Sequence, residues 1–243
     1  MIPKSPSLRS GRTRLAALIV PVSFLLACVP IHAATESFLF GVGTAVPDGT
    51  TAGLADVQMI SSSLSTLTDV NVTLDLSAIG AGGFNGDLYV TLVHDTGFGV
   101  LLNRSGRTGI APFGYGDHGF AITLDDQSPD NVHSYRTTLF GNETTALVGT
   151  LTGSWKPDGR TTDPAAVVTS DTATTGLGSF NGTAGSGQWI LFVADIERGA
   201  TMRLNNWSLQ LTGVAVPESS SALAALGMFG ALTWFAWRKN RSR

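Results

Sequence analysis

Strict alternation of apolar and polar residues is the feature that most constrains the fold of this chain. The segment from 69 to 76 reads DVNVTLDL, so Val70, Val72, Leu74 and Leu76 share one face of an extended strand. Because successive side chains of a β-strand point to opposite faces, this period of two predicts a half-buried strand. The same period recurs in four later segments, which are DLYVTLV (87–93), FAITL (120–124), WILFVAD (189–195) and WSLQL (207–211).

The segment WILFVAD is apolar on both of its faces, as expected of a strand in the middle of a sheet. Between the predicted strands lie glycine-rich segments such as GAGGFNG (80–86) and FNGTAGSG (180–187), which are typical of turns. No part of the body shows a sustained helical period, and its roughly 180 residues are enough for one substantial core. The sequence therefore predicts an all-β, antiparallel β-sandwich, in which four apolar residues are expected to be buried: Trp189, Val193, Leu209 and Leu211.

Residues 1–33 have the pattern of a secretory signal peptide. Basic residues come first, an apolar stretch follows from 15 to 29, and small residues lie near the end of the segment. We expect signal peptidase to cleave between Ala33 and Ala34. The apolar stretch is short and contains Pro21, which disfavours a permanent N-terminal membrane helix.

Lipidation is an alternative fate of the same segment. The residues LLAC, 25–28, loosely resemble a lipoprotein processing box, which would make Cys28 a lipid-modified N-terminus. Cys28 is the single cysteine of the chain. Cleavage after Ala33 would therefore leave a mature chain without a thiol, which excludes disulfides and any cysteine-based catalytic or metal site.

The charges are distributed unevenly between the body and its two ends. Eight of the 15 Lys and Arg residues lie before residue 15 or after residue 237, which leaves seven in the body against 17 of the 18 acidic residues. The body therefore carries a net charge of about −10, although the formal net charge of the chain is −3. An acidic body suits an exported domain and argues against nucleic acid as a partner.

Three segments of the body resemble the P domain (P/Homo B domain) of proprotein convertases and bacterial subtilisin-like proteases. The most specific is GQWILFVADIERGATMRLNNWSLQLTG (187–213), which keeps the family's glycine, tryptophan, leucine and asparagine spacing. The segments NGDLYVTLVHDTGFGVLLNRSG (85–106) and GSWKPDG (153–159) are also similar to it. The resemblance covers residues 64 to 213, with a divergent centre, and implies a jelly-roll-like β-sandwich.

In that family the P domain follows a protease domain and carries no catalytic residue, so the resemblance implies a protein that is not an enzyme. A Ser-His-Asp protease needs three separate motifs, and the chain has no room for such a domain. The body contains His94, His118 and His133, and we expect the last two to be exposed loop residues. Ser186 lies in a glycine-rich turn that lacks the strand-turn-helix context of a nucleophile.

The resemblance also implies calcium binding, because members of the family often bind this ion. Carboxylate oxygens are hard ligands that suit Ca²⁺, and the candidates are Asp87, Asp95 and Asp195. Where the family usually has GDTG, this chain has GATM (199–202), so Ala200 replaces one potential ligand. The alternative is that the aspartates accept hydrogen bonds from backbone amides of nearby turns.

The C-terminal residues 216–243 resemble the PEP-CTERM sorting signal. Val216, Pro217 and Glu218 form the motif, although Ser219 replaces its usual second proline. A short apolar span, 221–237, follows, and it is about 25 Å long as a helix, near the lower limit for crossing a bilayer. A basic tail, 238–243, comes last and contains four positive charges: Arg238, Lys239, Arg241 and Arg243. The resemblance implies recognition by an exosortase and cleavage near the motif; a plain membrane anchor is the alternative.

Together these features predict an exported, non-catalytic module with a binding or structural role. Its expected parts are the signal peptide (1–33), an N-terminal lead with the first strands (34–63), the sandwich (64–214) and the sorting signal. Its expected partners are signal peptidase, an exosortase, the inner membrane in transit, and an exopolysaccharide or another envelope protein at the cell surface or outside the cell. One alternative is a component of a subtilisin-like proteolytic system. Another is a carbohydrate-binding jelly roll, which would need Trp155, Phe113 and Tyr115 exposed on one face.

Overall fold

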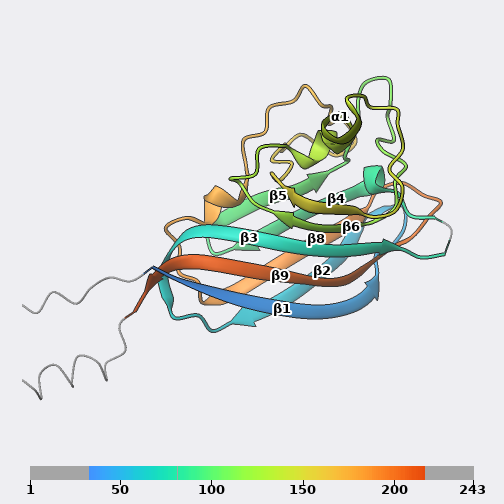
Figure 1. The fold of residues 1–243 in the computed structure, drawn as a ribbon. Helices are drawn as coiled ribbons and strands as arrows, with labels where there is room; N and C mark the ends of the chain where they lie inside the picture. The colour runs from blue at the N-terminus through green and yellow to red at the C-terminus, as the bar shows by residue number, and fades with distance from the viewer. Residues whose placement is uncertain (1–32, 81, 217–243) are drawn as a thin grey trace, which may run out of the picture. The chain divides into compact units, whose positions relative to one another are not determined.

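Two β-sheets form the body, which is described for residues 33–80 and 82–216 in a computed structural model (Figure 1). In these residues the first sheet has five strands in the order β1-β9-β3-β6-β7, and the second has four in the order β2-β8-β4-β5. The strands are β1 (Ala33–Ala45), β2 (Thr50–Ile60), β3 (Leu64–Ala78), β4 (Leu88–His94), β5 (Gly97–Asn103), β6 (Phe120–Leu124), β7 (Leu151–Trp155), β8 (Gly187–Asp195) and β9 (Met202–Ala215). The short helices are η1 (Asn85–Asp87), η2 (Val132–Ser134), α1 (Tyr135–Phe140) and η3 (Leu177–Phe180). The prediction of an all-β sandwich is confirmed.

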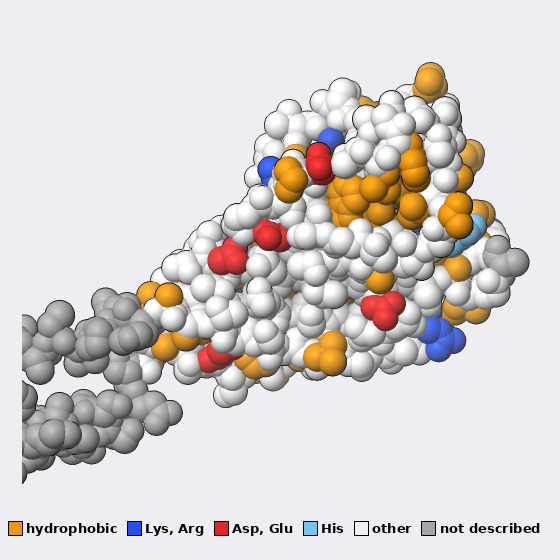
Figure 2. Space-filling view, in the orientation of Figure 1, with side chains coloured by type: hydrophobic (Ala, Val, Ile, Leu, Met, Phe, Trp, Pro, Cys, Tyr) orange, Lys and Arg blue, Asp and Glu red, His pale blue; other side chains and the backbone are white. Residues whose placement is uncertain are grey.

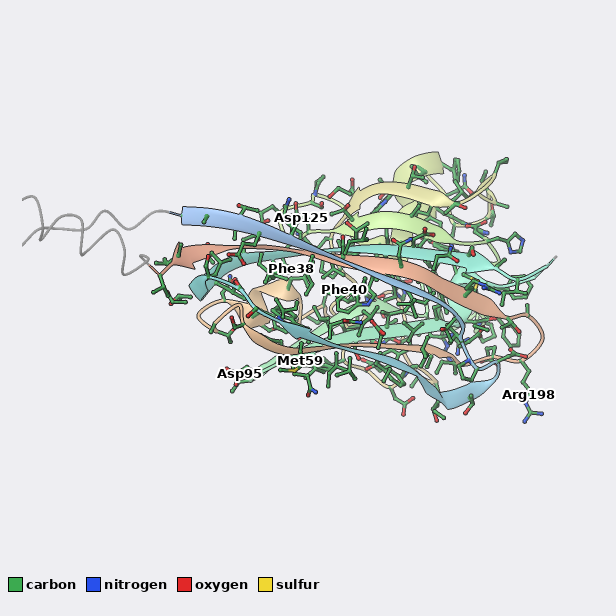
Figure 3. The ribbon with its side chains drawn as sticks, turned by 90° about the horizontal axis from the view of Figure 1, so that it is seen from below. Phe38, Phe40, Met59, Asp95, Asp125 and Arg198 are labelled. Atoms are coloured by element: carbon green, nitrogen blue, oxygen red, sulfur yellow. The ribbon has the colours of Figure 1, made fainter. Side chains whose placement is uncertain are left out.

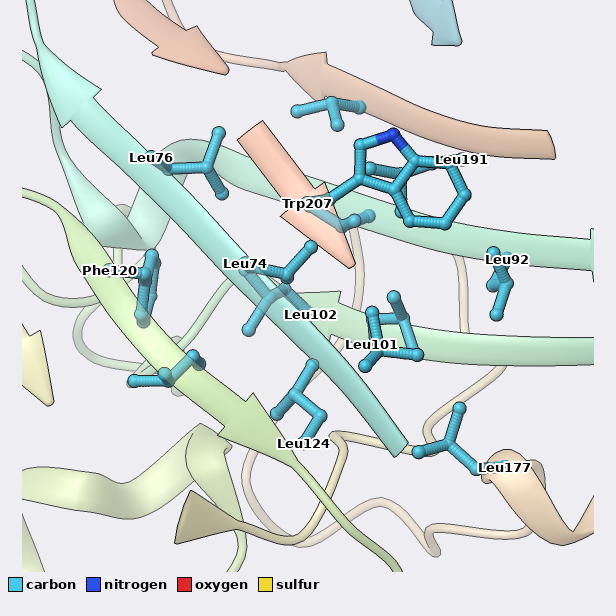
Figure 4. Packing of buried hydrophobic residues seen from close by; sticks show 14 of the residues in the cluster. Leu74, Leu76, Leu92, Leu101, Leu102, Phe120, Leu124, Leu177, Leu191 and Trp207 are labelled. Carbon is cyan, nitrogen blue, oxygen red and sulfur yellow. The ribbon is translucent and has the colours of Figure 1, made fainter. Parts of the chain in front are cut away.

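The period-two residues form the core between the sheets. Val72 and Leu74 of β3, Leu191 of β8 and Trp207 of β9 are fully buried, and Figure 4 shows several of these side chains packed together. The four residues predicted to be buried, Trp189, Val193, Leu209 and Leu211, are all 0% exposed. Strand β8 lies between β2 and β4, as expected of a central strand, and its Ile190 and Phe192, on the face away from the core, are half-buried.

Most neighbouring strands run antiparallel, but β6 and β7 run parallel. Parallel neighbours need a long crossover connection, and residues 125–150, which include η2 and α1, supply it. The alternating pattern of a strand carries no information about the direction of its neighbour. For this reason the sequence predicted an antiparallel sandwich without this exception.

A polar contact joins the two sheets near their open side, where β1 and β2 are edge strands. The indole Nε1 of Trp207 on β9 donates a hydrogen bond of 2.7 Å to Asp56 Oδ2 on β2. The ring of Phe40 on β1 lies 4.6 Å from the ring of Trp207. Figure 3 shows Phe38 and Phe40 along β1, on the side of the molecule where β2 carries Met59. Residues 34–63 therefore contribute one edge strand to each sheet.

Long connections cover one end of the sandwich and are held by buried polar groups. His133 Nδ1 lies 2.7 Å from Asp158 Oδ2, and both side chains are 0% exposed. Arg160 Nη1 donates to the other carboxylate oxygen of Asp158 at 3.1 Å. The prediction that His133 is exposed is therefore wrong, because the loops fold over β5 and enclose it. His118 is exposed, as expected.

Several predictions fall outside the described residues. These are the signal peptide up to residue 32, Pro217 and Glu218, the apolar span 221–237 and the basic tail 238–243. Ala33 and Ala34, which flank the predicted signal cleavage point, begin strand β1. Within residues 33–80 and 82–216, no helix has the length and apolar character needed to cross a bilayer.

Replacing Trp189 by Ala tests whether the core depends on this residue. Trp189 is fully buried, its ring stacks on His94 at 4.0 Å, and Phe180 packs on it at 5.3 Å. We expect a loss of about 3–5 kcal/mol in the free energy of unfolding, measured by urea denaturation. The matched control is Phe113→Ala, because Phe113 is 64% exposed and its loss should change stability little. Equal effects of the two substitutions would contradict this account of the core.

Candidate functional site

Two buried aspartates meet at one end of the four-stranded sheet. Asp87 ends η1, immediately before β4, and Asp195 is the last residue of β8. Because β4 and β8 are antiparallel neighbours with Leu88 opposite Asp195, the pairing brings both carboxylates to the same end. Asp87 is 4% exposed and Asp195 is 0% exposed. The sequence singled out both residues, and the structure brings them together.

The Asp195 carboxylate is buried without a hydrogen-bond partner at either oxygen. The Met202 amide faces it and lowers its pKa, but this amide does not reach hydrogen-bonding geometry. Burial, and then the negative charges of Asp87 and Asp48, raise the pKa of Asp195 to about 7. Burial likewise raises the pKa of Asp87 to about 6, although the nearby Arg104 acts in the opposite direction. Both carboxyl groups therefore hold protons more tightly in this site than in water.

Arg104 is the buried cation of this end, but its hydrogen bonds go to other groups. Its Nη1 lies 3.0 Å from Glu197 Oε1, its Nε donates to Gly86 O at 2.5 Å, and its Nη2 donates to Pro112 O at 3.2 Å. Arg104 is 1% exposed. The charge of Arg104 therefore acts to lower the pKa of Asp87 and Asp195, but its hydrogen bonds go to other groups.

Asp95 does not belong to this end of the sheet. It follows His94 in the turn between β4 and β5, at the opposite end of β4 from Asp87, and it is exposed with a φ of 49°. Figure 3 places Asp95 and Arg198 at opposite ends of the sandwich, and Arg198 comes three residues after Asp195. Of the three candidate calcium ligands, the structure therefore brings Asp87 and Asp195 to one end of β4 and places Asp95 at the other end.

One observation bears on the calcium binding that the resemblance implies, which is that both carboxylate oxygens of the buried Asp195 lack a hydrogen-bond partner. Among residues 33–80 and 82–216, however, no three His, Cys, Asp or Glu side chains already form a metal site. The sequence interpretation passed over Asp48, which lies in the β1–β2 connection and whose charge acts on both aspartates. In the sequence Asp48 lies in Pro-Asp-Gly, 47–49, which is typical of an ordinary turn, so the local pattern does not mark Asp48 as a site residue.

A cavity of about 380 Å³ is lined by His94, Asp95 and Ser186 among others. These residue types could form a catalytic triad, but their hydrogen bonds lead elsewhere. Both ring nitrogens of His94 face backbone carbonyls, at 2.8 Å from Gln188 O and 2.7 Å from Ala184 O. Ser186 Oγ donates to Ser62 O at 2.7 Å and accepts from Ser62 N at 2.8 Å. In this arrangement His94 does not activate Ser186 as a nucleophile.

The three aromatic residues considered for carbohydrate binding do not share an exposed face. Trp155 is 5% exposed and Tyr115 is 3% exposed, whereas Phe113 is 64% exposed. Trp155 Nε1 donates to Thr152 O, and the Tyr115 ring packs 4.7 Å from Tyr135. Apolar side chains do gather between α1 and β6 in Figure 2. This surface is not built on the predicted aromatic platform.

No family model and no curated protein matches the chain. Among solved structures, one that is similar is described as "Crystal structure of serine protease of Aeromonas sobria". It has 16% sequence identity and a TM-score of 0.39. The match covers 76% of this chain and 28% of that chain. The P-domain resemblance accordingly stays a prediction.

The raised pKa values predict a pH-dependent stability in the presence of a chelator. Folded Asp87 and Asp195 hold protons up to pH about 6 and about 7, whereas both release them near 3.8 when unfolded. The protonated carboxyl groups therefore contribute their full share to the free energy of unfolding below pH 3.8. This contribution is lost as the pH rises to about 7, and the loss is on the order of 1.4 kcal/mol per pH unit for each proton. Urea unfolding at a series of pH values measures this loss.

Asp195→Asn should flatten this fall, because asparagine stays neutral at every pH. Asp95→Asn is the matched control, since Asp95 is exposed and lies at the other end of β4. A fall in stability that is unchanged in Asp195→Asn would contradict the assignment.

Proposed function

We propose that this chain is an exported, non-catalytic β-sandwich module of the P-domain type, with a binding or structural role at the cell surface or in the extracellular matrix. The observation that carries the proposal is where the most specific P-domain-like segment lies. Residues 187–213 form β8 and β9, which are interior strands of the two sheets. The resemblance therefore falls on residues that build the interior of the sandwich, as a P domain with jelly-roll-like architecture would require.

The arrangement around His94 supports a role without catalysis. A general base needs a free ring nitrogen within reach of the nucleophile's proton. Both nitrogens of His94 face backbone carbonyls, and Ser186 is bound to the backbone of Ser62. A role as a component of a proteolytic system would then depend on a catalytic group outside the described residues.

The geometry of the two chain ends supports transient tethering followed by cleavage. Ala33 lies opposite Val214 in the β1–β9 pairing, so the predicted signal cleavage point and the end of β9 are neighbours. Val216 is 57% exposed, and its N–H donates to Ser63 O at 2.9 Å. Val216, the first residue of the predicted motif, is thus the last residue of the described body, so cleavage at the motif would leave both sheets intact.

A serine-directed fluorophosphonate tests the absence of catalysis. We expect no labelling of the purified chain and no hydrolysis of casein, because the described Ser186 has no free base beside it. Trypsin serves as the positive control for the reagent. Stoichiometric labelling of one serine, abolished by Ser186→Ala, would overturn the proposal and place the chain among hydrolases.

Intact mass measurement in the native host tests the sorting signal. We expect a mature chain that starts at Ala34 and ends close to Val216-Pro217-Glu218. Replacing Pro217 and Glu218 by Ala should leave the chain uncleaved in the inner membrane. Ser219→Ala is the matched control and should be processed normally, because position 219 already departs from the motif. A wild-type C-terminus at Arg243 in a host with an exosortase would mean a plain anchor.

A further inference from the structure

Strands β1 and β2 are long edge strands that lie on the same side of the body. β1 has 13 residues and β2 has 11, and Figure 1 shows both along the lower side of the sandwich. Within the described ranges, no backbone hydrogen bond joins a loop to either strand. An uncovered edge strand presents a row of unpaired N–H and C=O groups, to which another strand can add.

The other two edges of the sheets are protected. The edge strand β7 has only five residues, and short edge strands pair poorly with other chains. The edge of β5 is covered by a loop, because Val100 N donates to Thr175 O at 3.1 Å and Gly159 N donates to Val100 O at 2.9 Å. The fold therefore protects the edges on one side of the body and leaves those on the other side free.

The core is incomplete on the open side. Phe38 and Phe40 of β1 and Leu54 of β2 pack against the core but are only half-buried, whereas the core residues of the interior strands are fully buried. On the outer faces of the same two strands, Leu39 is 74% exposed and Met59 is 75% exposed. Apolar surface is therefore left on both faces of the free edges.

The charged groups of the two edge strands are held inside the protein. β1 and β2 contain one charged residue each and no Lys, Arg or Pro, which are residues that discourage edge pairing. Glu36 accepts hydrogen bonds from Ser63, and Asp56 accepts one from Trp207. Because the body carries a net charge of about −10, two copies repel each other over most of their surface. The open side is a surface where they can meet without opposing carboxylates.

We propose that the open side is a homodimer interface, in which β1 pairs antiparallel with β1 of a second copy of this chain. An antiparallel pair of identical strands has two-fold symmetry, as a closed homodimer requires. Leu39 is the middle residue of β1, Ala33–Ala45, so full overlap places it opposite its counterpart. The two-fold axis is then perpendicular to the sheet and brings β2 toward β2 of the second copy, because β2 is the edge of the other sheet on the same side. The half-buried side chains of the open side then enter a shared core.

The mass of the full-length chain in a mild detergent, measured by light scattering during size-exclusion chromatography, tests the proposal. We expect twice the mass of one chain. Leu39→Lys should weaken the dimer at least about tenfold, since it removes two buried leucines and places two like charges opposite each other. Leu39 is exposed in the single chain, so its variant should unfold in urea as the unmodified chain does. Ile110→Lys is the matched control, because Ile110 is 98% exposed in a loop outside both sheets.

Mixing two variants shows whether position 39 faces its counterpart. Leu39→Lys and Leu39→Glu should each be monomeric, whereas an equal mixture should form a dimer, because opposite charges then lie across the two-fold axis. An unmodified chain that stays monomeric up to ~1 mM would overturn the proposal. So would a dimer that persists in Leu39→Lys, that is lost in Ile110→Lys, or that does not form in the mixture. A monomer that binds a different protein through β1 would also contradict it.

Discussion

The dry interface between the two sheets is the constraint on which the rest of the structure depends. The inner faces of β3, β8 and β9 contribute fully buried residues such as Leu74, Leu191 and Trp207, which exclude water from the space between the sheets. A polar group that reaches this interface must find a partner there. Trp207 on one sheet donates its indole hydrogen bond to Asp56 on the other sheet. Asp195, at the end of the interface, has none.

Asp117 shows how this protein satisfies a buried carboxylate elsewhere. Arg136 binds it with two hydrogen bonds, Nη2 to Oδ1 at 2.7 Å and Nε to Oδ2 at 2.8 Å, and Tyr135 donates a third. Burial would raise the pKa of Asp117, but these hydrogen bonds lower it below its ordinary value. The pKa of Asp195 moves the other way in the same molecule. Asp195 is therefore a buried carboxyl group that the described residues leave without the hydrogen bonds that Asp117 receives.

The sequence predicted the features that depend on local residue patterns. It did not predict the features that are set by contacts between segments far apart in the chain. Strands such as β3 and β8 follow from the alternation of their residues, and so does the burial of Trp189. The parallel β6–β7 pair, by contrast, is set by a long crossover. His133 is enclosed by loops that come together only in the folded chain. Asp48 was overlooked for the same reason, since its contact with Gly199 joins residues 151 positions apart.

The acidic end of the sandwich, which holds Asp48, Asp87 and Asp195, lies away from the end where the described chain begins and finishes. Ala33 begins β1, and the connection that holds Asp48 follows the other end of this 13-residue strand. A strand of that length extends ~43 Å, so the acidic end lies far from the point where the chain leaves the body at Val214 and Val216. The buried carboxyl groups and the two ends of the described chain therefore lie at opposite ends of the sandwich, where the strand pairing alone places them.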